Sequence, residues 1–207
     1  MDTTVNSEQK HYKVLRTELT PNPNALQFVV DGQVIAAGNK SFSSLASAKG
    51  DGLGEALFQI EGVENVYMNE DYVTVSKKLS IDWDTITATV TTTIESHLSF
   101  YKEGTEDVDL VEKASAEEEV PEDKEFKDLT EAQKIKLINE LLDVEIRPFL
   151  AGDGGGLSVV SVVDRNVNVF YQGACGSCPS STAGTMQYIQ SLLQERLDPD
   201  IVVEAGN

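Results

Sequence analysis

The sequence predicts an α+β protein of two small α/β-sandwich-like domains joined by an acidic linker. Its 207 residues, 40% of them hydrophobic, supply enough apolar side chains for two small cores. Residues 103–128 interrupt the hydrophobic patterns and carry 12 acidic and 3 basic residues. We therefore expect a first domain over residues 1–102, a flexible, self-repelling linker over 103–128 and a second domain over 129–207.

The first domain is expected to contain two hairpin-like strand pairs and two helices. Apolar patterns and turn signals predict strands at 13–16, 26–30, 63–68 and 72–76 and helices at 54–60 and 82–98. In the second helix Ile86, Val90 and Ile94 recur every four residues after Asp82, a residue type that caps helix N-termini. Residues 36–52 are rich in Ser, Gly and Asn and predict a mostly irregular connection.

The second domain follows the order helix, hairpin, cysteine loop, helix. Thr130 and Gln133 have the spacing of a capping box and mark the start of the first helix, which Pro148 should kink or end. The remaining patterns predict strands at 157–163 and 167–171, a helix at 183–197 and a last strand at 201–203.

Charge and hydropathy restrict the partners of the chain. The net charge of −19 disfavours binding to nucleic acid and to anionic membranes. No apolar run is long enough to span a bilayer. The first ten residues are polar and have the pattern of neither a signal peptide nor a transit peptide. We therefore expect a cytoplasmic protein with reduced thiols, and neither nucleic acid nor a membrane as its partner.

Residues 173–179, which we call the cysteine loop, contain the only two cysteines of the sequence, Cys175 and Cys178. At this spacing two side chains can turn toward one point, so both sulfurs can bind one metal or each other. The loop lies between a predicted strand and a predicted helix, and Pro179 suits the first helical turn. Unpaired N–H groups and the dipole of that helix favour thiolate over thiol.

Several kinds of site fit a Cys-x-x-Cys pair. Inert burial is disfavoured because Gly173, Gly176 and the nearby serines predict a small, accessible loop. A dithiol–disulfide oxidoreductase uses the same spacing, but we expect an antiparallel hairpin here in place of a βαβ unit. Structural zinc and iron–sulfur clusters usually take four ligands, and the chain adds only His11 and His97, both in the first domain. Two chains related by a two-fold axis would supply two cysteine pairs, and such an exposed site would be labile.

Two other patterns carry little chemistry. The glycine-rich residues 152–156 precede a strand and lack a following Gly-Lys-Ser/Thr, so they predict a helix C-terminal turn with positive φ rather than a phosphate loop. Neither histidine lies near a candidate nucleophile, and no Ser/His/Asp triad is recognisable. We therefore expect no enzymatic activity.

Three segments of the second domain resemble the C-terminal domain of NifU-like (Nfu-type) iron–sulfur proteins. They are Ile146-Arg147-Pro148, Asp153-Gly154-Gly155 and the stretch from Gln172 to Thr182, which includes both cysteines. The segments Thr20-Pro21-Asn22-Pro23-Asn24-Ala25-Leu26, Ile60-Glu61-Gly62-Val63 and Val73-Thr74-Val75 are similar to the N-terminal domain that often accompanies it. Gly156 departs from the resemblance, because an acidic residue would be expected there.

The resemblance implies a scaffold or carrier that holds a [4Fe–4S] cluster between two chains and passes it to apo-proteins. Cys175 and Cys178 of each chain would be the ligands, whereas Asp153, Gly154 and Gly155 would form a turn without a ligand role. The implied partners are apo iron–sulfur target proteins, a cluster donor and a second copy of the chain. The first domain is our candidate for the contact with targets or donors. A [2Fe–2S] form, a dithiol oxidoreductase and a zinc-bridged dimer remain open alternatives.

Overall fold

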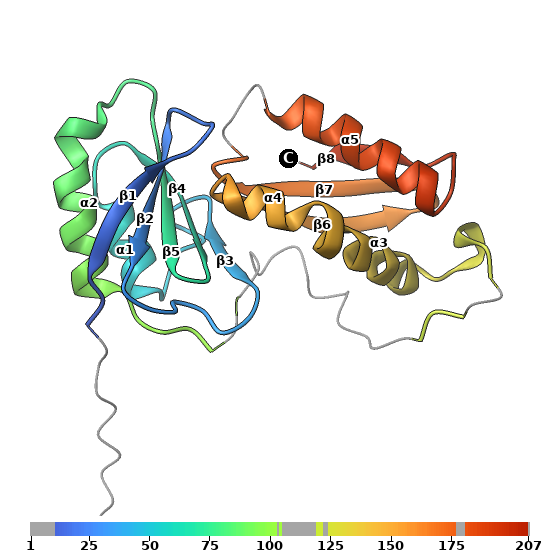
Figure 1. Ribbon diagram of the computed structural model, residues 1–207, viewed down its shortest axis with the longest axis horizontal. Coiled ribbons are helices and arrows are strands. Elements are labelled where there is room, and N and C mark those ends of the chain that lie inside the picture. Colours follow the sequence, from blue (N-terminus) through green and yellow to red (C-terminus); the bar gives the residue numbers. More distant parts are fainter. Residues whose placement is uncertain (1–10, 103, 105–118, 122–123, 177–180, 207) are drawn as a thin grey trace, which may run out of the picture.

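The structure, a computed structural model, describes residues 11–102, 104, 119–121, 124–176 and 181–206. Within this part, five α-helices and two β-sheets form the α+β protein that the sequence predicts. Figure 1 shows a unit with five strands beside a unit with three. We call residues 11–104 the N-terminal unit and residues 119–206 the C-terminal unit. Most of the expected linker, residues 105–118 included, lies outside the described residues.

The N-terminal unit is an antiparallel sheet in the order β1-β2-β5-β4-β3, with two helices on one face (Figure 1). Its elements are β1 (Val14–Leu19), β2 (Ala25–Val30), β3 (Asn39–Phe42), α1 (Gly52–Phe58), β4 (Val63–Asn69), β5 (Tyr72–Lys77) and α2 (Trp83–His97). Because side chains alternate across a strand, Phe28, Val73 and Val75 face the helices and pack in one core with Val90 of α2. Both predicted strand pairs and both predicted helices are confirmed.

Strand β3 lies within the segment that we expected to be irregular. It pairs with β4 from Asn39 to Phe42. The segment is fixed by Asp51, the N-cap of α1, which accepts a hydrogen bond from Gly54 N at 2.7 Å and lies 2.9 Å from Lys40 Nζ. A mostly buried ion pair thus orders a stretch whose composition alone suggests a loop.

The C-terminal unit is a three-stranded sheet in the order β6-β7-β8. Its elements are α3 (Glu131–Glu145), α4 (Arg147–Gly152), β6 (Gly155–Val163), β7 (Asn166–Gly173), α5 (Ser181–Arg196) and β8 (Val202–Ala205), after a 3-10 turn at Phe126–Asp128. The capping box is confirmed: Thr130 Oγ1 accepts from Gln133 N at 3.2 Å, and Gln133 Oε1 accepts from Thr130 N at 3.1 Å. Pro148 lies in the first turn of α4, where the chain turns away from α3 as predicted.

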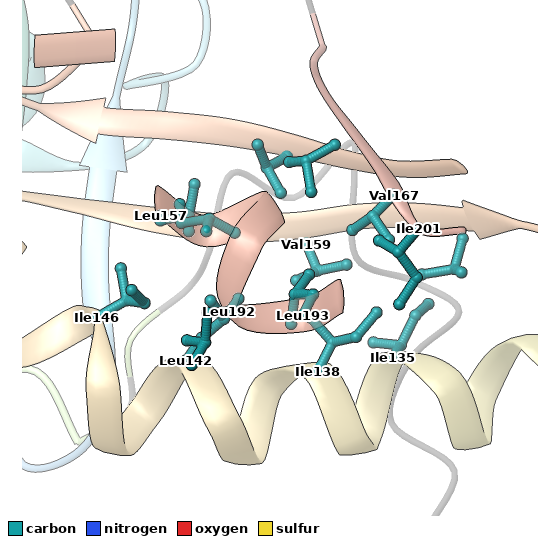
Figure 2. Packing of buried hydrophobic residues seen from close by; sticks show 14 of the residues in the cluster. Ile135, Ile138, Leu142, Ile146, Leu157, Val159, Val167, Leu192, Leu193 and Ile201 are labelled. Carbon is teal, nitrogen blue, oxygen red and sulfur yellow. The ribbon is translucent and has the colours of Figure 1, made fainter. Parts of the chain in front are cut away.

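Helices α3 and α5 share a core with one face of this sheet. Figure 2 shows Ile138 and Leu142 of α3 directed toward the sheet residues Leu157 and Val159, with Leu193 of α5 between them. All five side chains are buried. This core shares no residue with the core of the N-terminal unit, so each unit has its own apolar interior.

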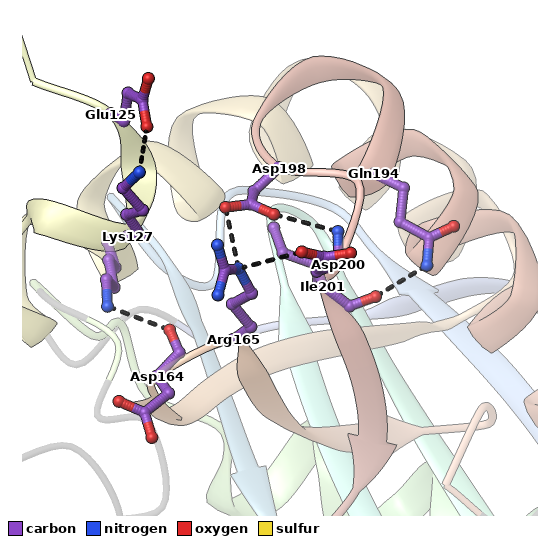
Figure 3. Close-up of polar contacts among 9 residues, drawn as sticks. Glu125, Lys127, Asp164, Arg165, Gln194, Asp198, Asp200 and Ile201 are labelled. Atoms are coloured by element: carbon purple, nitrogen blue, oxygen red, sulfur yellow. Dashed lines mark hydrogen bonds and ion pairs between the residues drawn. The ribbon is translucent and has the colours of Figure 1, made fainter.

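Polar contacts close the end of the C-terminal unit that lies opposite the cysteine loop. Arg165, in the turn between β6 and β7, lies 3.0 Å from a carboxylate oxygen of Asp198, just after α5 (Figure 3). The other oxygen of Asp198 accepts a hydrogen bond from Asp200 N at 3.0 Å. The hairpin is therefore anchored at the end that lies away from the cysteine loop.

The face of the N-terminal sheet that points away from α1 and α2 packs against the C-terminal unit, where β4 and β5 contact β7. We call it the outer face, and its buried residues include Ala25, Gln27, Val29, Ser41, Tyr67, Tyr72, Thr74 and Ser76. Tyr72 Oη donates to the carbonyl of Ala151 at 2.9 Å, and Gln27 Nε2 donates to the same carbonyl at 3.3 Å. Burial raises the pKa of Tyr72 to about 12 and also raises that of Tyr67.

Some polar groups at this contact are buried without partners. Among the described residues, the hydroxyls of Thr74 and Ser76 and the side-chain carbonyl of Gln172 on β7 make no hydrogen bond. A buried polar group without a partner costs about 1–3 kcal/mol relative to one that water solvates. These groups therefore weaken the association of the two units.

Leu142→Ala should lower the free energy of unfolding of the C-terminal unit by about 2–5 kcal/mol, because the side chain is fully buried in the shared core. Val144 on the same helix is 73% exposed and supplies the matched control. Val144→Ala should change the free energy by about 0.5 kcal/mol or less. Urea unfolding followed by circular dichroism measures both, and equal losses would contradict this packing.

The raised pKa of Tyr72 predicts a loss of stability at high pH. In the unfolded chain the phenol ionises near its usual pKa of about 10, but in the folded chain it stays neutral up to about 12. The stabilisation is therefore complete below about pH 10 and is lost as the pH rises toward 12. Tyr171, whose pKa burial also raises to about 12, acts in the same window. Ultraviolet absorbance of tyrosinate should rise at higher pH in the native protein than in urea, and coincident titrations would refute this.

Candidate functional site

The cysteine loop begins in a tight turn at the end of β7. Ala174 N donates to the carbonyl of Gly154 at 3.1 Å, and Gly176 N donates to the carbonyl of Gly173 at 3.2 Å. Helix α5 follows the loop. The second predicted ligand, Cys178, lies outside the described residues. The described part of the loop thus leaves the end of β7 and leads toward the N-terminus of α5, as the sequence predicts.

A missing side chain on β6 lets the thiol of Cys175 approach the backbone. A Cβ placed on Gly155 would lie 2.6 Å from Cys175 Sγ and 2.6 Å from the carbonyl oxygen of Gln172. Any other residue at this position would displace the loop. Gly154, just before it, has a φ of 77°, which confirms the predicted turn after α4 and accounts for that glycine without a phosphate site.

Cys175 is more buried than the sequence predicts. Only 5% of its surface is exposed, and it belongs to the hydrophobic core of the C-terminal unit. The prediction of an accessible loop is therefore wrong for this residue. Small residues around a thiol do not leave it exposed if they also allow a neighbouring strand to pack against it.

The loop lies within a βαβ unit, a feature that we did not expect from the sequence. Strand β8 runs parallel to β7, with Asn166 paired to Val202 and Val169 paired to Ala205, and α5 connects the two strands. The prediction that only an antiparallel hairpin surrounds the cysteines is wrong, because a short apolar run cannot reveal which strand it pairs with. The turn from a parallel strand to a helix N-terminus is a common place for anionic groups and cofactors.

Residues of the N-terminal unit also contact the cysteine loop. Asn22 Nδ2 donates to the carbonyl of Ala174 at 2.9 Å in a buried contact. Tyr67 lies across two glycines of the hairpin, since a Cβ on Gly156 would be 2.8 Å from its hydroxyl and one on Gly173 would be 2.9 Å from its Cβ. No N-terminal residue was expected at this site. The only signal in the sequence is the resemblance of residues 20–26 to the family.

Three tyrosines lie within the electrostatic influence of Cys175. Burial is the main cause that raises the pKa of Tyr67, Tyr72 and Tyr171, and a Cys175 thiolate raises each of them further. A tyrosine hydroxyl is protonated at neutral pH even with its ordinary pKa of about 10, so these three add no negative charge beside the sulfur. The positive charge of Arg147, whose Nε donates to the carbonyl of Leu157 at 3.1 Å, acts to lower the pKa of Tyr67.

The described residues contain no group of three or more His, Cys, Asp or Glu side chains that could hold a metal ion. None of the described helices has both the length and the apolar character needed to cross a membrane.

Comparison with known proteins gives two matching family models. The model for "Scaffold protein Nfu/NifU N terminal" matches residues 15–100, and that for "NifU-like domain" matches residues 138–204. A human relative named "NFU1 iron-sulfur cluster scaffold homolog, mitochondrial" is 34% identical over 188 residues, which are 88% of this chain and 68% of the relative. A Drosophila willistoni protein of the same name is 32% identical over 188 residues, 89% of this chain and 61% of the relative. "NifU-like protein 4, mitochondrial" from Arabidopsis thaliana is 29% identical over 189 residues, with 89% and 63% covered.

These names overturn the predicted location. All three relatives are named as mitochondrial, so the prediction of a cytoplasmic protein is wrong by this comparison. That prediction rested on the composition of the first ten residues. The chain spans only 61% of the Drosophila relative, so those residues alone do not report on targeting.

The two family models match the two units in chain order, and the second includes the βαβ unit around the cysteine loop. The human relative extends over both units at 34% identity. Relatives of this kind are named for cluster scaffolding rather than for a catalysed reaction. The chain is therefore a member of the NifU-like (Nfu-type) family of iron–sulfur cluster scaffold proteins.

Proposed function

We propose that the chain holds a [4Fe–4S] cluster between two copies, bound through Cys175 and Cys178 of each copy, and passes it to apo iron–sulfur proteins. Family membership supports the scaffold role. The cysteine count supports the bridged arrangement, because such clusters usually take four thiolates and each chain has two cysteines. The cluster is cargo in this proposal. The same ligands would also accept a [2Fe–2S] cluster.

The observation that carries the proposal is the position of Cys175 between β7 and α5. The first N–H groups of a helix lack partners within it, and the helix dipole places partial positive charge at that end. Both favour the thiolate that binds iron and offset the negative charge of a cluster. The close approach to Gly155 fixes the sulfur on a paired hairpin rather than on a free loop.

In this proposal the two domains expected from the sequence have different roles. Two α/β-sandwich-like domains, residues 1–102 and 129–207, would be joined by an acidic linker over 103–128. The second would bind the cluster. The first would contact apo-targets or a cluster donor, since its described residues form no group of metal ligands and its family model is that of a scaffold N terminus.

Cys175→Ser and Cys178→Ser should each abolish stable cluster binding, because each substitution removes a thiolate from both chains of the dimer. Anaerobic reconstitution with iron and sulfide, followed by native mass spectrometry and visible absorption, measures the loading. Ser191→Ala on α5 is the control and should load like the unchanged protein. The fold should persist in both cysteine variants by circular dichroism. If the unchanged chain stays a monomer without iron and loses two protons on oxidation, it is a dithiol oxidoreductase instead.

Removal of residues 1–102 should slow cluster transfer without lowering cluster content, if the first domain contacts the acceptor. The C-terminal unit has its own core and should still load. The rate is measured as the recovery of activity in an apo-enzyme that requires a [4Fe–4S] cluster, with iron content as the control. Unchanged transfer to every acceptor tested would remove the proposed role of this domain.

A further inference from the structure

Hydrogen bonds join the N-terminal unit to two segments of the C-terminal unit near Cys175, the end of α4 and the start of the cysteine loop. On one side, the carbonyl of Ala151 at the end of α4 accepts a hydrogen bond from Tyr72 Oη at 2.9 Å. On the other side, the carbonyl of Ala174 accepts one from Asn22 Nδ2 at 2.9 Å. Asn22 is only 1% exposed, so the second bond is shielded from water. The two bonds together hold the outer face over the base of the cysteine loop.

Glycines form the surface that the outer face covers. Tyr67 lies across Gly156 and Gly173, and a Cβ on Gly154 would be 3.0 Å from the side chain of Gln27. A side chain at Gly156 would meet Tyr67, so the glycine leaves room for the contact between the units.

Several features of the contact between the two units favour its reversible separation. Thr74 and Ser76 on one side and Gln172 on the other are buried without hydrogen-bond partners among the described residues, and all three would regain water on separation. The main cores of the two units share no residue, so separation would expose only the smaller apolar cluster of Val29, Tyr67 and Tyr72 at the contact. Opening thus exposes this one small cluster and breaks the hydrogen bonds to the carbonyls of Ala151 and Ala174, but it restores hydration to several buried polar groups.

We propose that the outer face is a reversible cap on the cysteine loop, latched by Asn22 and Tyr72, which keeps Cys175 buried until a cluster is loaded. The identity of the cargo rests on the proposed function above, but the cap itself does not. Cys175 packs in the core of its own unit and has 5% of its surface exposed in the closed arrangement, so it is not accessible to the ligands of a second chain. Loading of a bridged cluster therefore requires the cap to open. Asn22 and Tyr72 are positioning residues in this scheme and touch no cargo.

The cap is tested on the whole apo chain through the reactivity of Cys175. Cys178→Ser leaves one thiol in the chain, so iodoacetamide labelling read by mass spectrometry reports on Cys175 alone. Asn22→Ala and Tyr72→Phe each remove one latch bond, and each should speed labelling roughly two- to tenfold, since the rate follows the population of the open form. Gly156→Ala should act in the same direction from the C-terminal side, by displacing Tyr67.

Gln59→Ala is the matched control, because it removes an exposed amide at the end of α1. It should leave the labelling rate unchanged. Equal rates in the control, in both latch variants and in Gly156→Ala would overturn the cap and show that the C-terminal unit alone buries Cys175. Faster labelling in the Asn22 variant alone would also overturn it, because Asn22 Oδ1 accepts from Asn24 N and its loss could loosen only the local turn.

A second measurement separates the cap from the proposed function. Hydroxyl-radical footprinting of the chain with native cysteines compares Tyr67 before and after reconstitution with iron and sulfide, with Tyr12 in the N-terminal core as the control. Oxidation of Tyr67 should rise when the cluster loads. A loaded dimer with Tyr67 still protected would overturn the cap. A chain that loads no cluster but passes the labelling test would keep the cap and lose the proposed function.

Discussion

The arrangement of the site depends on one close approach, that of the Cys175 thiol to the backbone of Gly155. There is no room for a Cβ between them. Gly155 is paired with Gly173, so the strand that precedes the loop and the strand that receives the thiol are held in one register. The left-handed turn at Gly154 lets β6 begin directly after α4, so that Gly155 lies beside the thiol. The sheet therefore places the sulfur, and the loop does not need to be rigid by itself.

Two opposing effects act on a sulfur in this position. The helix N-terminus after the loop favours the charged thiolate, whereas burial in an apolar core disfavours any charge. The proposed bridged cluster would need the thiolate and also access from a second chain. Both requirements are met more easily when the surroundings of Cys175 open than when they stay closed. Burial and function can thus be reconciled by a movement of the N-terminal unit, with the hairpin unchanged.

The sequence predicted the features that depend on near neighbours. The capping box at Thr130, the break at Pro148 and the turn at Gly154 each follow from a few adjacent residues, and each is found. Asp82 lies at the N-cap of α2 as expected, although its side chain makes no capping bond. Strand β3, the parallel pairing of β8 and the burial of Cys175 were missed because each depends on a partner distant in sequence. The ligand role of the cysteines was proposed from the resemblance and is still a proposal.

The outer face shows why such a surface escapes prediction. Gln27, Thr74 and Ser76 alternate with apolar residues, a pattern typical of a strand with one face in water. In the structure that face lies against the C-terminal unit. The surface of the C-terminal unit that contacts Tyr67 is formed largely by the backbone of glycines. Burial of Val29, Tyr67 and Tyr72 stabilises this contact, and the loss of solvent by several hydroxyls offsets part of that gain. A strand face that tolerates water is therefore also suited to a contact that can separate. The strand sequences alone do not distinguish a face in water from a face in such a contact.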